Sequence, residues 1–257
     1  MKNLLMNTSV ADSYNSPAQR VRVITENWMS TNGYCPKCLS FLIQAKANSK
    51  VCDFICTPCQ RSFELKSKKG SLGKKITDGA YSSMISRIKE DNSPDFFFLN
   101  YDNEFNIKNL IVVPSYFFQA HIIEKRHPLP ETARRAGWIG CSILLAKIPN
   151  IGKINIVKNS SIILPSQVAN LWRKTTFLAE TSNLQNRGWV LDILKCIELL
   201  KLQSFSLNDL YKFEDYLASI HPNNNHIKAK IRQQLQLLRD TGYLEFRGSG
   251  KYEIILQ

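Results

Sequence analysis

The sequence has few acidic residues and no long apolar run. It holds 21 Asp and Glu against 34 Lys and Arg, which leaves a net charge of +13. No apolar run approaches the ~18 residues of a membrane span, and the apolar core of the N-terminal segment, residues 4–6, is too short for a signal peptide. We therefore expect a cytoplasmic protein that does not enter a membrane. The basic excess favours a polyanionic partner.

Other common signatures are missing as well. No internal repeat, low-complexity tract, glycine-rich nucleotide loop or Ser-His-Asp arrangement is apparent. At 257 residues with 44% hydrophobic residues, the chain can hold one large globular domain or two ordinary ones. Residues 1–181 carry 24 Lys and Arg against 13 Asp and Glu, whereas residues 182–257 carry 10 against 8, so the basic excess belongs to the first part.

Four of the seven cysteines form two Cys-x-x-Cys pairs. Cys35 and Cys38 are followed, after seventeen intervening residues, by Cys56 and Cys59. This spacing predicts a zinc ribbon, in which each pair supplies two thiolates to a tetrahedral Zn²⁺ ion. We expect a structural site because no spare ligand adjoins it; the alternative is four buried or disulfide-bonded cysteines. The other three cysteines lie among apolar residues and are expected to be buried free thiols.

Two acids and a lysine surround the second cysteine pair. Asp53 lies in a strand predicted over residues 51–55, and Glu64 and Lys66 share one face of a strand predicted over residues 62–67. If the strands are neighbours, the three side chains converge. Asp53 and Glu64 would then hold Mg²⁺, and Lys66 would orient or help to deprotonate the water that attacks a phosphodiester. The alternative is a solvated strand face.

Longer strings surround these residues. They are Cys-Pro-x-Cys at 35–38, Asp-Phe-x-Cys-x-x-Cys at 53–59, Phe-Glu-Leu-Lys-Ser-Lys-Lys-Gly at 63–70, and residues 78–81, 94–99, 132–141, 187–189 and 224–228. In these strings the chain resembles the DpnI-like methyl-directed type II restriction endonucleases over nearly its whole length. The resemblance implies an α/β fold: a PD-(D/E)XK restriction-endonuclease-like catalytic domain with an inserted zinc site, plus a C-terminal winged helix-turn-helix domain.

The resemblance also implies an activity. The expected enzyme is a monomer of the bacterial cytoplasm that uses Mg²⁺ to cleave double-stranded DNA at GATC sites carrying N6-methyladenine. It would leave 5′-phosphate ends and serve in restriction-modification and phage defence. Asp53, Glu64 and Lys66 match the family's catalytic positions, and the four paired cysteines match its zinc positions.

The element pattern divides the chain at the polar stretch 180–187, into a catalytic domain over residues 1–181 and a winged-helix domain over residues 182–257. In the first part we predict helices over 17–32, 77–90 and 168–172, and strands over 96–101, 105–113, 154–157 and 162–164. Glu26, on the first helix, could reach the metal but is expected to be an exposed acid.

Cations beside the proposed active site are candidate DNA contacts. Lys68 and Lys69 lie in a loop predicted over residues 66–75 that could grip phosphates, although such a loop could also only aid solubility. Arg134 and Arg135 precede Trp138, an aromatic that could stack on or wedge into DNA while the guanidinium groups hold phosphates. The alternative for Trp138 is a place in the core.

Three helices and a hairpin are predicted in the last part. The first carries Trp189, the second is capped by Ser206, and the third begins near Asn225; strands over 243–246 and 252–256 follow around the glycines at 248 and 250. Such a winged helix lays its third helix in the major groove, or serves as a protein-interaction module. The candidate DNA contacts are Asn225, His226, Lys228, Arg232, Arg247 and Lys251.

Two rival functions remain open at this point. In a non-enzymatic zinc-ribbon and winged-helix regulator of transcription, Asp53, Glu64 and Lys66 would only decorate a strand. A nuclease of branched or damaged DNA would keep those three residues but show no dependence on methylation.

Overall fold

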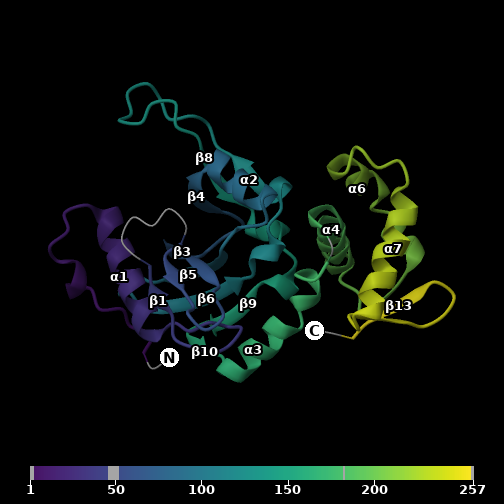
Figure 1. Ribbon diagram of the computed structural model, residues 1–257, viewed down its shortest axis with the longest axis horizontal. Coiled ribbons are helices and arrows are strands. Elements are labelled where there is room, and N and C mark those ends of the chain that lie inside the picture. The colour runs from purple at the N-terminus through teal and green to yellow at the C-terminus, as the bar shows by residue number, and fades with distance from the viewer. Residues whose placement is uncertain (1–2, 46–51, 182, 256–257) are drawn as a thin grey trace. The chain divides into compact units, whose positions relative to one another are not determined.

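The structure, a computed structural model, describes residues 3–45, 52–181 and 183–255. Parts of four predictions lie outside these residues: residues 1–2 and 46–51 of the first domain, residues 182 and 256–257 of the second, Val51 of the strand 51–55, and Leu256 of the strand 252–256. The chain forms two compact units (Figure 1), one of residues 1–146 and 152–173, the other of residues 147–151 and 174–257.

A seven-stranded sheet lies at the centre of the first unit. Its order is β1-β2-β3-β5-β6-β9-β10; β3 and β5 run parallel, and the five other neighbouring pairs are antiparallel. Strand β5 is buried along its whole length, which fits its place in the middle and its run of three phenylalanines. The strands are Ile43–Gln44 (β1), Phe54–Ile55 (β2), Ser62–Lys69 (β3), Asp95–Tyr101 (β5), Ile107–Val113 (β6), Ile154–Lys158 (β9) and Ser161–Ile162 (β10).

Helix α1 (Pro17–Asn32) packs on β3 and β1. As the sequence predicts, it begins with Pro17 directly after Ser16, where the missing N–H of proline costs nothing. It ends before Gly33, whose N–H donates a hydrogen bond to the carbonyl of Met29 at 2.7 Å. The predicted helix 17–32 is confirmed.

The core of this unit lies between the sheet and its helices. Trp28 from α1 and Trp172 from α3 (Pro165–Arg173) are buried in it, and α3 packs on β9. The rings of Phe63 and Phe97 stack with centroids 5.0 Å apart. Because they belong to the parallel pair β3 and β5, this contact holds β3 against the most buried strand of the sheet.

A smaller sheet of order β4-β8-β7 lies beside the first, with α2 (Tyr81–Lys89) packed on it. Its strands are Ile76–Ala80 (β4), Ile123–Lys125 (β7) and Gly140–Ile143 (β8). The helix predicted from residue 77 is therefore wrong at its start: Thr77 pairs with Ser142 in the sheet, and the helix begins only at Tyr81. Pairing with a distant strand outweighs the local helical pattern.

The predicted loop 66–75 also begins later than expected. Pairing of β3 with β5 continues to Lys69 and Tyr101, so Lys68 and Lys69 lie on the strand, and Gly70 turns the chain with a φ of 77°. Short 3-10 helices connect other elements at Ser9–Ala11, Ser115–Phe117, Ala120–Ile122, Leu145–Lys147, Asn150–Gly152 and Thr176–Leu178.

The second unit contains helices and a three-stranded sheet of order β11-β13-β12. Its elements are α4 (Leu184–Leu200), β11 (Ser204–Ser206), α5 (Leu207–Tyr211), α6 (Glu214–Ile220), α7 (Ile227–Asp240), β12 (Leu244–Phe246) and β13 (Lys251–Ile254). Ser206 caps α5 in a reciprocal capping box with Asp209, which confirms the predicted cap. The predicted second helix is broken in two between Tyr211 and Glu214, and β11 was not predicted.

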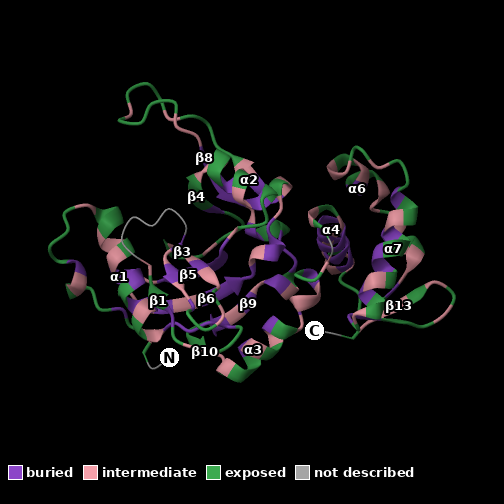
Figure 2. Ribbon diagram, viewed as in Figure 1, coloured by how far each residue is buried: buried purple, intermediate pink, exposed green. Residues whose placement is uncertain are grey.

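The helices, the sheet and the tip at residues 247–250 form a winged helix-turn-helix. Gly248, Ser249 and Gly250 all have positive φ, which allows the tight turn of the wing. Figure 2 shows that α4 is mostly buried within its unit while the wing is largely exposed. Among the residues that the structure describes, no helix is long and apolar enough to cross a membrane.

Candidate functional site

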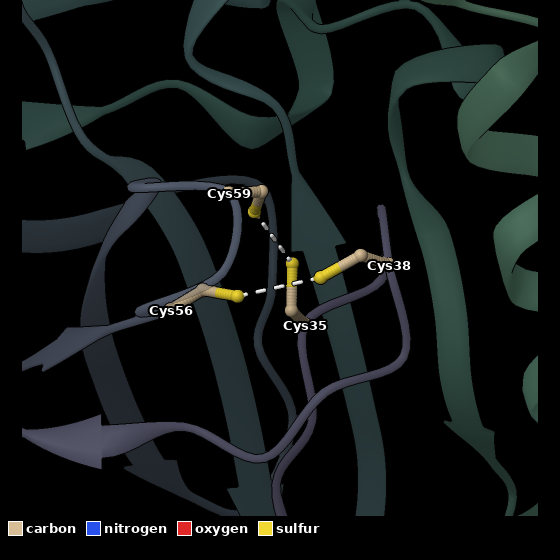
Figure 3. Close-up of side chains that lie close together, drawn as sticks. All are labelled: Cys35, Cys38, Cys56 and Cys59. Atoms are coloured by element: carbon tan, nitrogen blue, oxygen red, sulfur yellow. Dashed lines mark hydrogen bonds between the residues drawn. The ribbon is translucent and has the colours of Figure 1, made fainter.

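The four paired cysteines converge on one point (Figure 3). All four Sγ atoms lie within 4.8 Å of one another, with Cys35 to Cys59 at 3.5 Å and Cys38 to Cys56 at 3.4 Å. A tetrahedral ion with Zn–S bonds of about 2.3 Å would space its sulfurs about 3.8 Å apart, within the observed range. The cluster could therefore hold a metal ion of that kind.

The two cysteine turns are built alike. In the first, the N–H of Cys35 donates to the carbonyl of Ser40, and the N–H of Leu39 donates back to Cys35. The second repeats this with Cys56, Arg61 and Gln60, and both Leu39 and Gln60 have positive φ. Each turn thus aims its two sulfurs the same way, so the approach of the turns creates four converging ligands.

Burial acts on the thiols of this cluster. It raises the pKa of Cys35 and that of Cys56, the latter to about 11. Cys38 is less enclosed: burial would raise its pKa, but hydrogen bonds with Ser40, Cys56 and Cys35 together outweigh that effect and lower its pKa to about 6. Because thiolates are the ligand form, a bound cation would be needed to keep all four sulfurs deprotonated at once. The donor set therefore fits a soft or borderline cation.

Asp53, Glu64 and Lys66 form a second cluster at β3. One Asp53 carboxylate oxygen accepts a hydrogen bond from the backbone N–H of Leu65 at 2.8 Å, which places Asp53 beside the strand. Glu64 Oε1 accepts from Lys66 Nζ at 2.5 Å. The strands β2 and β3 are neighbours, as predicted, and pair Phe54 with Phe63. However, β2 begins only at Phe54, so Asp53 lies just before the strand and not within it, as the predicted strand 51–55 had it. The structure thus brings the three predicted side chains to one region of the sheet.

Two further charged residues join this cluster, and the local sequence pattern did not predict either of them. Asp78 on β4, only 5% exposed at its side chain, forms an ion pair with Lys66. Arg87 on α2 lies 3.3 Å from the second Glu64 oxygen. Asp78 lies within one of the strings that carry the family resemblance, but the spacing of Asp53, Glu64 and Lys66 does not include it.

The expectation that Glu26 is an exposed helix acid is wrong. The residue is only 8% exposed. Its carboxylate accepts hydrogen bonds from Arg22 at 2.8 Å and from Gln44 at 3.0 Å. Burial raises its pKa against the effect of Arg22, and the negative charge of Asp53 raises it further. The face of α1 that packs on β3 therefore brings a fourth carboxylate near the cluster.

The electrostatics of the cluster show more negative charge than its cations balance. Burial raises the pKa of Glu64, Lys66 opposes that rise, and Asp78 and Asp53 add to it. Burial alone would lower the pKa of Lys66, but Asp78 and Glu64 together raise it. Lys66 is therefore an ammonium at neutral pH. A site of crowded carboxylate oxygens with an adjacent ammonium has the donors that a hard divalent cation prefers.

The predicted DNA contacts of the first unit lie at its surface. Lys68 and Lys69 are exposed at the end of β3. Arg134 and Arg135 are exposed in the loop between β7 and β8, which extends away from the small sheet in Figures 1 and 2. Trp138 is half-buried, with Arg135 stacked on its ring at 4.5 Å. Trp138 thus lies at the base of the loop, outside the buried core.

In the second unit, several of the residues predicted to contact DNA already interact with other side chains of that unit. Lys228 on α7 pairs with Glu214 at 3.1 Å, and Arg232 donates to the hydroxyl of Tyr211 at 2.8 Å. Arg247, at the wing, pairs with two acids of the hairpin. Lys251 is exposed at the start of β13, and Asn225 and His226 are exposed just before α7.

A mixed α/β unit with a four-cysteine site, followed by a winged helix-turn-helix, is the architecture of a DNA-binding protein. A family model described as DpnI, Dam-replacing family, matches residues 2–181, and one described as Dam-replacing HTH domain matches residues 185–254. The chain belongs to the Dam-replacing family. It is thereby a restriction endonuclease of the DpnI type, a hydrolase whose partner is DNA.

Proposed function

We propose that the chain cleaves both strands of duplex DNA at GATC sites whose adenines carry an N6-methyl group, through Mg²⁺-dependent hydrolysis at Asp53, Glu64 and Lys66. The observation that carries the proposal is the convergence of these residues on β3 in a chain of the Dam-replacing family. The α/β sheet, with its parallel β3–β5 pair, supports a PD-(D/E)XK fold.

The roles of the residues follow from their chemistry. Asp53 and Glu64 would hold Mg²⁺, which fits because their oxygens lie in a half-buried region with excess negative charge. When bound, the ion would neutralise charge that develops on the phosphate and lower the pKa of water. Lys66, fixed as an ammonium, would orient the attacking water and offset negative charge in the transition state. Departure of the 3′ oxygen would leave a 5′-phosphate end.

Zn²⁺ is the proposed occupant of the four-cysteine site, with a structural role. The second cysteine turn connects β2 to β3, the strands that carry or adjoin the proposed catalytic residues. An ion there would join this turn to the one after α1. It would therefore hold β3 in register without taking part in hydrolysis.

Methyl recognition would require contributions from more than one contact. The N6-methyl group lies in the major groove, where an apolar surface could meet it. Burying one methyl is worth only about 0.8 kcal/mol, so strong discrimination is easier if both methyl groups, or both units, contribute. Trp138 beside Arg134 and Arg135 in the first unit, and Asn225 and His226 before α7 in the second, are the proposed readers.

The test is cleavage of one plasmid prepared with and without adenine methylation, in Mg²⁺. Wild type is expected to cut only the methylated plasmid, and Lys66→Ala neither. Lys108→Ala, at a partly exposed lysine that pairs with Asp102, is the control and should cut like wild type. Equal cutting of both plasmids would refute methyl dependence. DNA binding by wild type without any cutting would instead favour a non-enzymatic regulator.

A further inference from the structure

A carboxylate from the small sheet reaches the ammonium of the large one. Asp78 lies on β4, which pairs with β8 in the three-stranded sheet, whereas Lys66 lies on β3 of the seven-stranded sheet. The two side chains are in ion contact, with 5% of the Asp78 side chain and 19% of the Lys66 side chain exposed. Through this contact, a charged side chain of the small sheet reaches the proposed catalytic strand.

A β-bulge lies directly beside Asp78. Asp78 pairs with Cys141, but the next pair along the strands joins Ala80 to Gly140, so Gly79 is an extra residue at a bulge. Bulges re-aim neighbouring side chains and recur beside active sites. The strand beside the bulge is closely packed, since a Cβ on Gly140 would lie 2.8 Å from the Trp138 ring.

Lys66 has two carboxylate partners, and these differ in their other interactions. Glu64 Oε1 lies 2.5 Å from Nζ, but Glu64 also has its second oxygen near Arg87 and is a proposed ligand of the divalent ion. Oxygens committed to that ion attract an ammonium less strongly. Asp78 is then the partner that remains, because it comes from another sheet and pairs with Lys66.

We propose that Asp78 is a positioning residue, which holds the Lys66 ammonium in its working orientation during hydrolysis. This proposal rests on the proposed function. It explains why a buried acid accompanies the lysine although the Asp53, Glu64 and Lys66 pattern is complete without it. The alternative is that Asp78 only balances a buried charge and contributes to folding alone.

Asp78→Asn separates these roles, because it keeps the shape of the side chain and removes its charge. Under single-turnover conditions with methylated duplex, we expect the cleavage rate to fall about 10²-fold, as small misplacements of reacting groups do. DNA affinity should stay close to that of wild type, and the variant should remain folded at the assay temperature even though its melting temperature falls with the loss of a buried ion pair. Asp12→Asn, which breaks the exposed pair of Asp12 with Arg20, is the matched control and should cut at the wild-type rate.

A double-mutant cycle with Lys66→Ala tests whether Asp78 acts through the lysine. If it does, Asp78→Asn will cause no further loss of the residual single-turnover cleavage that Lys66→Ala retains at high enzyme concentration and long incubation, since the group that it positions is gone. A further loss of the same size in both backgrounds would overturn the proposal. So would a loss of DNA affinity that accounts for the whole rate effect.

A crystal structure of Asp78→Asn gives a second readout that needs no activity. The expected result is a Lys66 side chain displaced from its wild-type position, with β4 unchanged. An unmoved Lys66 would overturn the proposal. If wild type cuts no DNA, the proposed function fails, whereas the structural comparison still decides whether Asp78 positions Lys66.

Discussion

The buried ion pair of Arg61 and Asp95 gives the sharpest prediction about stability. Arg61 lies between the second cysteine pair and β3, and Asp95 begins β5. The guanidinium meets the carboxylate with two hydrogen bonds, at 2.5 and 2.6 Å, and the N–H of Ser115 donates to the same carboxylate at 2.7 Å. The Asp95 side chain is 1% exposed, so these partners replace the water that would otherwise solvate its carboxylate.

Arg61→Ala should therefore be costly. Removing one partner of a buried pair leaves an uncompensated charge, which destabilises by about 3–5 kcal/mol. For a unit of this size, that corresponds to a fall in melting temperature of roughly 6–20 °C. Asp95→Asn should cost less, about 1–3 kcal/mol, because the Arg61 side chain remains 23% exposed and keeps some solvation. The double variant should lose less than the sum of the two.

Hydrogen exchange of the β5 amides, read by mass spectrometry, is the assay of choice because it reports the first unit alone. The control is Lys75→Ala, which breaks a pair with Glu124 whose side chains are 57% and 41% exposed. That variant should cost no more than about 1 kcal/mol. If Arg61→Ala cost as little as Lys75→Ala, the reasoning about desolvation at Asp95 would be refuted.

Two further predictions concern the metal and the pH dependence of stability. Cys59→Ser should abolish stoichiometric zinc binding, measured by elemental analysis, and destabilise β3, whereas Cys196→Ser, at a buried free thiol in the second unit, should leave the zinc content unchanged. Hydrogen bonds, led by the backbone N–H of Asn106, lower the pKa of Asp102 to about 2 from its ordinary value of 3.8. Its stabilising effect is therefore complete above pH 4 to 5 and is lost as the pH falls toward 2, so Asp102→Asn should destabilise the protein at pH 7 and progressively less at pH 3, in urea titrations. An equal difference at both pH values would contradict this.

The proposed DNA contacts of the two units differ in whether DNA binding must first break ion pairs within the protein. Arg134 and Lys69 are exposed in the first unit, where the charge excess lies. In the second unit, Arg247 and Lys228 pair with acids of their own unit. Binding through the wing would exchange these pairs for phosphates. The electrostatic, salt-dependent part of DNA affinity should therefore come mainly from the first unit.

Features governed by local chemistry were predictable from the sequence. The cysteine spacing anticipated the converging sulfurs, since each Cys-x-x-Cys turn is a short-range structure with its own hydrogen bonds. Alternation along residues 62–67 anticipated that Glu64 and Lys66 share a face, because the period of a strand is two. Pro17 and Ser206 marked helix starts for equally local reasons.

Features that depend on partners distant in the sequence were not predictable. The pattern after residue 77 resembled a helix, and only pairing with β8 makes Thr77 part of a strand. The sequence could not tell whether Glu26 is exposed, because the packing of α1 on β3 is what buries it. The reason is that burial and ion pairing are properties of packed elements, and one sequence carries no register between elements far apart along it.

The sequence by itself thus determined which chemical groups this protein has and how neighbouring groups are spaced: four sulfurs in two turns, and Glu64 with Lys66 on one strand. The tertiary structure alone decided their surroundings. It brought Asp78 from a separate sheet to Lys66, and it buried Glu64 among carboxylates, which raises its pKa. Charge balance at a site depends on distances through space, and those exist only once the sheets and helices have packed.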